Sequence, residues 1–537
     1  MFSRRLFPAV LAAGFAVLAL CVGPAFSKPT AEEWKKIDAE ARRAFGTTDG
    51  DARVRAAEAL GAADCVEGVK LLVQLLNAPD RALLAAEAAR DAYEPEFYAA
   101  VERINKLAKQ NNNQVSIGEA EAFEKKAKEM ADRNQKVSEL SAVAYAIGDA
   151  LTKTRDADAV AWLVNEGLKD KQWRARTAVA LALGFAPADN PTPTPALLAA
   201  LADKDGRVRG AAIEALGRRG AKDAASAILA ALDDERWQVR VSAADALGVL
   251  AVRETVGPLI AHMQKEDGRL REDIDRALKA ITGITFRADP LGWKGWWELN
   301  GADWDSGKLV KKEEPKEPAE GGGEAAKDAG AAGKTVTFYG IETKSKNLIF
   351  VVDVSGSMSE DAALAPDAAS GRVPGQGPKG KRKIDVARYE LSKAIGQLPD
   401  DARFNIIMFS VEAKIYSPAK MVVANKATRT AAQKFAETLE PQEGTNIHDA
   451  LERAFELAGG GGMQVDENYK GSVDTIFFLT DGTPTLGKIT DPVKIADLVK
   501  KWNAIRKIRI HCIGIGKHAE DLLKRLSDES GGTYVKR

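Results

Sequence analysis

Residues 347–358 read Asn-Leu-Ile-Phe-Val-Val-Asp-Val-Ser-Gly-Ser-Met, an apolar run that ends in alternating polar residues. A short, continuously apolar run of this kind predicts a strand buried on both faces. Strand-like and helix-like segments alternate after it, which predicts an α/β fold with a doubly wound, mostly parallel sheet. We expect further strands at 404–409, 475–479 and 508–515, and helices at 384–398, 430–439, 447–457, 492–502 and 519–527.

Polar side chains collect where these strands end. Asp353, Ser355 and Ser357 follow the first strand, Asp481 follows a later one, and Thr445 lies just before a helix. In such sheets, ligands bind at the carboxyl ends of the strands. Two carboxylates and three hydroxyls offer only oxygen ligands, which suit a hard divalent cation such as Mg²⁺, with Mn²⁺ or Ca²⁺ as alternatives. Taken singly, each residue could instead cap a helix or form a turn.

Together these elements resemble a known family. Residues 336–537 look like a von Willebrand factor type A domain, in which Asp-x-Ser-x-Ser, a threonine and Asp-Gly form a metal-ion-dependent adhesion site. In that family a carboxylate from a protein partner takes the remaining coordination position. The resemblance therefore implies a metal-dependent protein-binding domain.

The resemblance also implies a role for each matching side chain. Ser355 and Ser357 would bind the metal directly through their hydroxyl oxygens, and Thr445 would do so once a partner is engaged. Asp353 and Asp481 would act through water and would orient the hydroxyls. All five positions of the family pattern are filled in this sequence.

One stretch departs from the family pattern. Residues 359–382, rich in Gly, Pro and Ala, separate the serines from the helix that follows them. Because this insertion begins two residues after Ser357, we expect it to leave the sheet beside the ion. Glu360, Asp361 or Asp367 could then occupy the open coordination position and gate the site. A passive loop is the alternative.

Residues 28–285 are rich in Ala and Leu and carry a recurring phrase, an arginine followed by Leu-Gly. It runs from Arg209 to Gly217 and again from Arg240 to Gly248. The arginines of this series lie 33, 31 and 31 residues apart, at 176, 209, 240 and 271. A period in the low thirties predicts an all-α solenoid of paired helices. The phrase resembles HEAT-like repeats.

The resemblance to HEAT-like repeats implies that the arginines and the turn residues Asp205, Asp234 and Asp267 tie adjacent repeats together. A charged stretch near 95–140 interrupts the period, and we expect it to be a helical insertion. Residues 286–307 contain a cluster of tryptophans. We expect them to cap the last repeat rather than to stack a sugar or a peptide.

Residues 308–334 consist largely of Lys, Glu, Ala and Gly, without an aromatic residue. Such a composition cannot bury enough apolar surface to order the chain, so it predicts a flexible low-complexity linker. The α/β domain then occupies residues 335–537. We expect the solenoid and this domain to move independently.

The first 27 residues read as a targeting segment. Arg4 and Arg5 precede an uncharged run, and small residues lead to Ser27. This pattern predicts a signal peptide cleaved after Ser27, and hence a periplasmic or secreted protein. A retained membrane anchor is the alternative. Cys65 and Cys512 fall in different predicted domains, so we expect no disulfide between them.

Several classes of function are disfavoured. Basic and acidic residues balance at 77 each, which gives no sign of nucleic-acid binding. The sequence holds no nucleophile elbow, H-E-x-x-H, phosphate loop or dinucleotide glycine pattern. His448 is expected on a helix surface and His511 in the core. The sequence thus predicts a non-enzymatic extracytoplasmic binding protein whose solenoid is a second interaction surface. A metal-dependent hydrolase, or an accessory subunit of a chelatase or ATPase complex, is the alternative.

Overall fold

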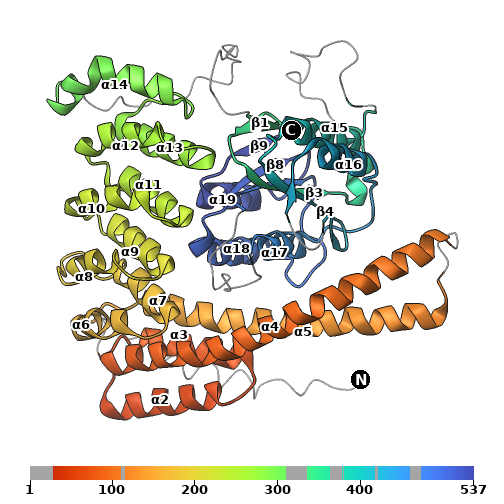
Figure 1. Cartoon of the computed structure of the whole chain (residues 1–537). Helices are drawn as coiled ribbons and strands as arrows, with labels where there is room; N and C mark the ends of the chain where they lie inside the picture. The colour runs from red at the N-terminus through yellow and green to blue at the C-terminus, as the bar shows by residue number, and fades with distance from the viewer. Residues whose placement is uncertain are drawn as a thin grey trace, which may run out of the picture. The chain divides into compact units, whose positions relative to one another are not determined.

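The computed structural model describes residues 28–110, 115–309, 335–362, 378, 380–417, 421–459 and 473–537 (Figure 1). The chain divides into two compact units, the first made of Met1–Leu83 and Glu139–Arg219, the second of Leu84–Ser138 and Gly220–Arg537. The predicted signal peptide at 1–27 and all but the first two residues of the predicted linker lie outside the described residues.

The first unit consists of repeat helices: α2 (Ala31–Phe45), α3 (Gly50–Ala62), α6 (Ala157–Asn165), α7 (Trp173–Leu183), α8 (Pro193–Ala200) and α9 (Gly206–Arg218). Two longer helices, α4 (Val66–Gln110) and α5 (Ile117–Leu151), cover most of the charged stretch near 95–140 and contribute to both units. The recurring Leu-Gly has a packing reason. A Cβ on Gly184 would lie only 2.9 Å from the Cα of Ala215 in α9, so this contact requires glycine.

The recurring arginine stabilises a turn of its own repeat. The Nη1 atoms of Arg176, Arg209 and Arg240 each donate to the carbonyl six residues earlier, at 2.9 Å in every case. Arg176 also donates to both carboxylate oxygens of Asp203 in the next turn, at 2.7 and 2.8 Å. The structural interpretation of these arginines is confirmed. Asp203, which the sequence pattern did not single out, provides a tie between adjacent repeats.

In the second unit the array continues with α10 (Ala225–Ala230), α11 (Trp237–Leu250), α12 (Val256–Met263), α13 (Arg269–Thr282) and α14 (Pro290–Asp305). Helix α14 carries the tryptophan cluster and packs against α12. Trp293 and Trp304 are buried, and their indole N–H groups donate to Asp275 Oδ1 at 2.6 Å and to the Arg253 carbonyl at 3.1 Å. These two rings therefore serve packing, as a cap requires.

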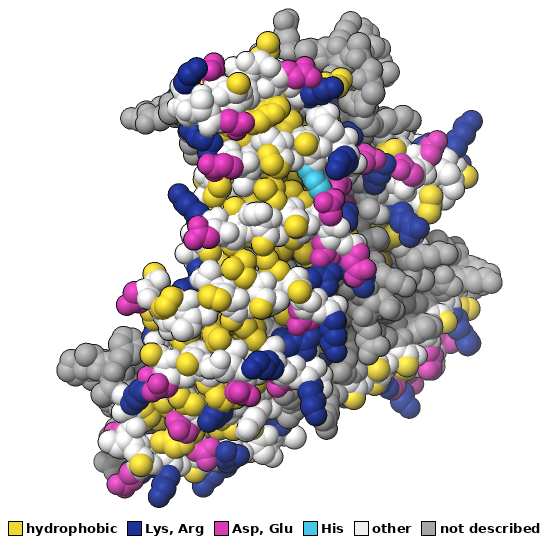
Figure 2. Space-filling view, turned by 60° about the vertical axis from the view of Figure 1, so that its left-hand side comes forward, with side chains coloured by type: hydrophobic (Ala, Val, Ile, Leu, Met, Phe, Trp, Pro, Cys, Tyr) yellow, Lys and Arg dark blue, Asp and Glu magenta, His cyan; other side chains and the backbone are white. Residues whose placement is uncertain are grey.

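Figure 2 shows one face of the repeat helices. Hydrophobic side chains gather there between the helices, with charged side chains to either side. In the second unit the side chains of Val249, Leu291 and Leu299 are 69%, 63% and 85% exposed. The array thus presents some apolar groups to solvent in addition to those buried between its repeats.

The rest of the second unit is an α/β domain with a seven-stranded sheet. Its strands are β3 (Asn347–Asp353), β4 (Arg403–Phe409), β5 (Ala413–Ile415), β6 (Val422–Val423), β7 (Thr475–Thr480), β8 (Arg509–Gly514) and β9 (Tyr534–Lys536). The order is β5-β4-β3-β7-β8-β9, with β6 also paired to β4. Strands β5 and β6 run antiparallel to β4, and the other pairs are parallel. The predicted fold class is confirmed.

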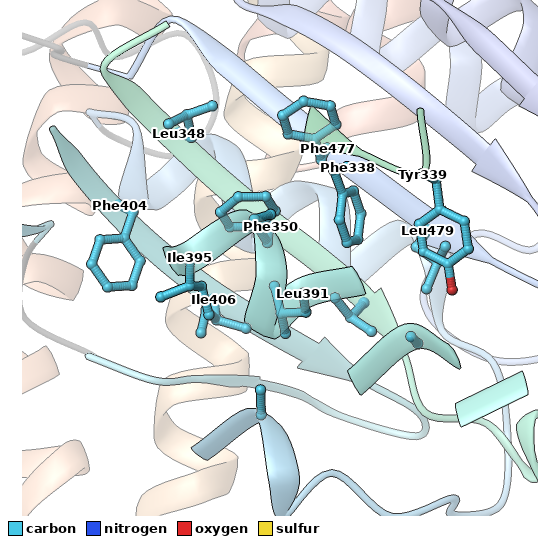
Figure 3. Packing of buried hydrophobic residues seen from close by; sticks show 14 of the residues in the cluster. Phe338, Tyr339, Leu348, Phe350, Leu391, Ile395, Phe404, Ile406, Phe477 and Leu479 are labelled. Atoms are coloured by element: carbon cyan, nitrogen blue, oxygen red, sulfur yellow. The ribbon is translucent and has the colours of Figure 1, made fainter. Parts of the chain in front are cut away.

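Helices cover both faces of this sheet (Figure 1). They are α15 (Lys383–Gln397) and α16 (Lys426–Glu437) on one face, and α17 (Ile447–Leu457), α18 (Pro492–Arg506) and α19 (Glu520–Ser530) on the other. Figure 3 shows the core beneath α15, where Leu391 and Ile395 lie close to Phe350. The rings of Phe350 and Phe477 stack with centroids 5.5 Å apart. Because β3 is buried on both faces, its sequence is continuously apolar rather than alternating.

The structure adds elements that the sequence did not predict. A separate hairpin of β1 (Val336–Phe338) and β2 (Ile341–Thr343) precedes the sheet, and the short strands β5, β6 and β9 extend it. Helix α16 begins four residues earlier than expected. The reason is Asn425, whose side chain accepts the backbone N–H of Thr428 and so caps the helix.

Helix α13 contacts the amino ends of the sheet strands within the second unit. Arg509, the first residue of β8, pairs with Glu272 and Asp273 of α13. Arg269 donates to the carbonyl of Asp474, next to β7, and to that of Lys507. The expectation that solenoid and α/β domain move independently is therefore wrong for the last repeats, because buried ion pairs join them to the sheet.

Candidate metal centre

The five candidate residues lie at the carboxyl ends of the central strands. The chain runs from β3 to β4 on one side and returns to β7 on the other, so the strand order reverses at β3. Asp353 is the last residue of β3, and Asp481 follows the last residue of β7. Such a switch point opens a crevice at which ligands bind.

Asp353 is buried, and its two carboxylate oxygens have different partners. Oδ1 accepts the backbone N–H of Ser355 at 2.7 Å, and Oδ2 accepts the hydroxyl of Thr480 at 2.5 Å. Burial raises the pKa of Asp353 to about 6, against the opposing effect of these two hydrogen bonds. Asp353 thus fixes the turn that carries the serines and offers negative charge in a site screened from water.

The two serine hydroxyls converge on Asp481. Ser357 Oγ lies 2.7 Å from Asp481 Oδ1, Ser355 Oγ lies 3.3 Å from the same atom, and the two hydroxyl oxygens are 3.1 Å apart. Three oxygen atoms from two strand ends therefore meet at one point. The short 3₁₀ turn at Gly356–Ser359 places both serines on the same side of the loop.

Thr445 approaches the same region from the loop before α17. Gly444, with φ of +83°, makes the turn that precedes it. The Thr445 backbone is held by Thr485, which accepts its N–H at 3.0 Å and returns a backbone bond to its carbonyl at 3.0 Å. A Cβ on Gly482 would lie 3.3 Å from Thr445 Oγ1, so the threonine hydroxyl stands directly over the Asp-Gly turn.

A cavity of about 540 Å³ opens beside these groups. One part of its wall carries Ser357, Thr445 and Asp481, and the remainder is formed by Gly482, Thr483, Thr485, Gly516, Lys517, His518, Glu520 and Lys536. The structure thus brings Ser357, Thr445 and Asp481 onto one cavity, with Ser355 and Asp353 directly behind them.

The donor set fits a hard divalent cation. Two carboxylates and three hydroxyls supply only oxygen atoms, and three of these atoms already lie within 3.3 Å of one another. Ser355, Ser357 and Thr445 would hold the ion through hydroxyls, while Asp353 and Asp481 would balance its charge. A thiophilic metal would not suit this group, which contains neither sulfur nor nitrogen.

Lys383 belongs to this site but was not predicted. Its Nζ donates to Asp481 Oδ2 at 2.9 Å and to Glu360 Oε2 at 2.7 Å. Burial opposes its charge, yet the bonds to Asp481 and Glu360 prevail and raise the pKa of Lys383. No signal in the sequence could have found this contact, since the partners of Lys383 lie 98 and 23 residues away.

The predicted gating carboxylates are placed differently from expectation. Glu360 pairs with Lys383 instead of turning to the metal position, and Asp361 forms an isolated bridge with Arg382. Most of the insertion, including Asp367, lies outside the described residues. Gating by Glu360 in this form is therefore wrong, because the Lys383 ammonium holds its carboxylate.

The histidines and cysteines have structural partners. His448 is buried, not on the helix surface as predicted; its Nδ1 lies 2.8 Å from Asp449 Oδ1 and its ring meets Trp502 edge-on. His511 is a core residue, as predicted, and accepts the N–H of Thr533. Cys65 and Cys512 are both buried free thiols.

Comparisons with known proteins agree with this geometry. Residues 379–536 match the profile of the von Willebrand factor type A domain, and residues 134–216 and 194–279 match HEAT repeats. Inter-alpha-trypsin inhibitor heavy chain H4 of Homo sapiens is 33% identical over 194 residues, which cover 36% of this chain and 18% of that protein. Heavy chain H2 of Mesocricetus auratus is 30% identical over 194 residues, covering 35% of this chain and 17% of that protein.

This chain therefore spans less than a fifth of the length of these relatives. Among solved structures, von Willebrand factor type A from Catenulispora acidiphila is 22% identical, with a TM-score of 0.28, and the match covers 36% of this chain and 39% of that one. Within the part of the chain that the structure describes, no helix combines the length and apolar character needed to cross a membrane.

Proposed function

Because residues 379–536 form a von Willebrand factor type A domain and residues 134–279 hold HEAT repeats, we propose that this chain is a metal-dependent protein-binding scaffold. Its type A domain holds Mg²⁺, or Mn²⁺ or Ca²⁺ in its place, and engages an acidic group of a protein partner. The repeats provide a second interaction surface. The protein acts outside the cytoplasm, as the pattern of its first 27 residues favours.

One observation carries the metal part of this proposal. The hydroxyls of Ser355 and Ser357 and one oxygen of Asp481 meet within 3.3 Å at the mouth of a cavity that Thr445 also lines. When bound, the cation supplies a positive charge with an open coordination position for a carboxylate. Asp353 orients the serine loop through the Ser355 N–H, so the hydroxyls are held ready without rearrangement.

The cavity favours an acidic partner. Lys517 and Lys536 contribute to its wall beside the metal-site residues. Lys536 also pairs with Glu520 at 2.7 Å, so this wall carries charges of both signs. A partner carboxylate directed at the metal would meet basic groups along the cavity, which lowers the cost of bringing a second negative charge there.

A binding role is favoured over hydrolysis by the state of the nearest histidine. His518 lines the cavity, but its Nδ1 lies 3.0 Å from the Gly516 carbonyl and its Nε2 lies 2.7 Å from the Tyr534 hydroxyl. Nδ1 must therefore carry the proton, and Nε2 accepts from tyrosine, which leaves no ring nitrogen to activate a nucleophile. The alternatives are a metal-dependent hydrolase and an accessory subunit of a chelatase or ATPase complex.

The test uses the full chain and two serines of the same turn. Ser357→Ala removes a hydroxyl that reaches Asp481, whereas Ser359→Ala removes one that donates only to the Gly356 carbonyl at 2.6 Å. At about 100 times its Kd, Mn²⁺ should stabilise the wild type and Ser359→Ala by about 2.7 kcal/mol. Ser357→Ala should gain clearly less. Equal melting temperatures with Mn²⁺ and with EDTA in the wild type would remove the metal site.

The partner and enzyme parts are tested separately. Arrayed peptides with and without a central Glu or Asp should separate in binding to the full chain only when Mn²⁺ is present. Binding that ignores both the metal and the peptide carboxylate would exclude the adhesion-type mechanism. Hydrolysis of an ester, peptide or nucleotide that survives purification but disappears in Ser357→Ala would favour the hydrolase instead.

A further inference from the structure

Lys383 stands between the candidate metal site and the insertion. It is the first residue of α15, and its side chain is only 8% exposed. Its ammonium bridges Asp481, which is 0% exposed, and Glu360, which is 66% exposed. A buried lysine of this kind requires paired carboxylates, since burial without them would neutralise it.

The two oxygens of Asp481 face different groups. Oδ1 accepts from Ser357 at 2.7 Å on the side where a cation would sit, and Oδ2 accepts from Lys383 at 2.9 Å. A divalent ion and the lysine ammonium would therefore share one carboxylate. Asp353 supplies the only other carboxylate among the five candidate ligands, so the lysine cancels about half of the negative charge that the site offers to a metal.

We propose that Lys383 is a resident cation that limits the affinity of this site for divalent metals and links it electrostatically to the neck of the insertion through Glu360. This inference rests on the metal site proposed above. Like charges in a water-poor site repel strongly, so the lysine opposes metal entry. Glu360 draws part of the lysine charge away from Asp481 and so favours the metal.

The backbone allows the side-chain pair to be changed without losing the neck. The Lys383 N–H donates to the Glu360 carbonyl at 2.9 Å, and the Ala362 N–H donates to the Lys381 carbonyl at 2.8 Å. These two backbone bonds close the base of the insertion independently of the ion pair. Glu360→Gln should therefore alter charge and leave the loop base in place.

The experiment is titration of the full chain with Mn²⁺ by calorimetry. Lys383→Met should bind Mn²⁺ at least about fivefold more tightly than the wild type, and Glu360→Gln at least about threefold more weakly. Lys517→Met is the matched control: it removes a charge from the cavity wall but leaves the Asp481 contacts intact, and should change the Kd by less than about twofold. Lys383→Gln, which keeps a donor for Asp481, guards against a folding defect in Lys383→Met.

The outcomes separate this proposal from the one it rests on. Wild-type binding of Mn²⁺ that neither Lys383 variant tightens, or that Lys517→Met tightens equally, overturns the role of Lys383 alone. Absence of Mn²⁺ binding in both the wild type and the Lys383 variants overturns the metal site as well. Tighter binding by both Lys383 variants together with weaker binding by Glu360→Gln supports the resident cation, because a purely structural lysine would not give opposite signs.

Discussion

Asp273 offers the sharpest test of how α13 is held against the sheet. Its carboxylate is 0% exposed and is surrounded by three arginines. Oδ1 accepts from Arg509 and, at 3.0 Å, from Arg276, while Oδ2 lies 3.2 Å from Arg269 Nε. The arginines hold the pKa of Asp273 below its ordinary value although burial opposes this. Asp273→Asn therefore removes the charge that three guanidiniums share.

The expected cost follows from what each arginine keeps. Arg509 retains Glu272, and Arg276 retains Asp245. Arg269 is fully buried, and its other described hydrogen bonds are to backbone carbonyls, so it would be left as a buried charge without a bonded carboxylate. Removing one partner of a buried pair costs about 3 to 5 kcal/mol. We expect Asp273→Asn to fall in this range.

Hydrogen exchange read by mass spectrometry measures this locally, which suits a chain of more than one domain. Peptides from α13 and β8 should exchange about a hundredfold faster, or more, in Asp273→Asn. Asp245→Asn is the control: that carboxylate is 40% exposed and its partner Arg276 keeps Asp273, so the loss should stay below about 1 kcal/mol. Adding Arg269→Met to Asp273→Asn should restore part of the protection. Equal protection in the Asp273 and Asp245 variants would refute the buried-charge reasoning.

Two further predictions concern the sheet and the site. Burial, aided by the charges of neighbouring arginines, holds the pKa of His511 well below 6.5, so below that pH the unfolded chain takes up a proton that the folded protein excludes. Stability should fall by about 1.4 kcal/mol more between pH 7.5 and 5.5 in the wild type than in His511→Gln, measured by urea unfolding; parallel pH profiles would contradict this. Gly482→Ala should displace the Thr445 hydroxyl, 3.3 Å from the added Cβ, and weaken Mn²⁺ binding several-fold in calorimetry; an unchanged Kd would place Thr445 outside the site.

The central elements of the α/β domain could be predicted because their sequences are controlled by local periodicity. Residues 347–353 and 447–457 have the predicted bounds, since a strand buried on both faces and an amphipathic helix leave clear patterns. The short edge strands β5, β6 and β9 could not, because two or three residues carry no period. Their pairing is decided by β4 and β8, far away in the sequence.

The site divides in the same way. Asp353, Ser355 and Ser357 lie within one turn, so their spacing alone indicated a shared function. Lys383 and Thr480 gave no such signal. Their roles depend on side chains that meet only after folding: Lys383 with Asp481, and the Thr480 hydroxyl with Asp353. The buried position of His448 was missed for a related reason, since Trp502 of α18 covers it from another helix.

Strand β7 connects the two features that sequence patterns could not join. Asp474, immediately before this strand, gives its carbonyl to Arg269 of α13, while Thr480 and Asp481 at the other end hold Asp353 and the serine hydroxyls. Between them β7 is hydrogen-bonded on both sides, to β3 and β8, and every residue of it is buried. A strand paired on both edges cannot bend or slip without breaking two ladders. The last repeats and the candidate metal centre are therefore fixed to opposite ends of one rigid element, roughly 20 Å long for six residues.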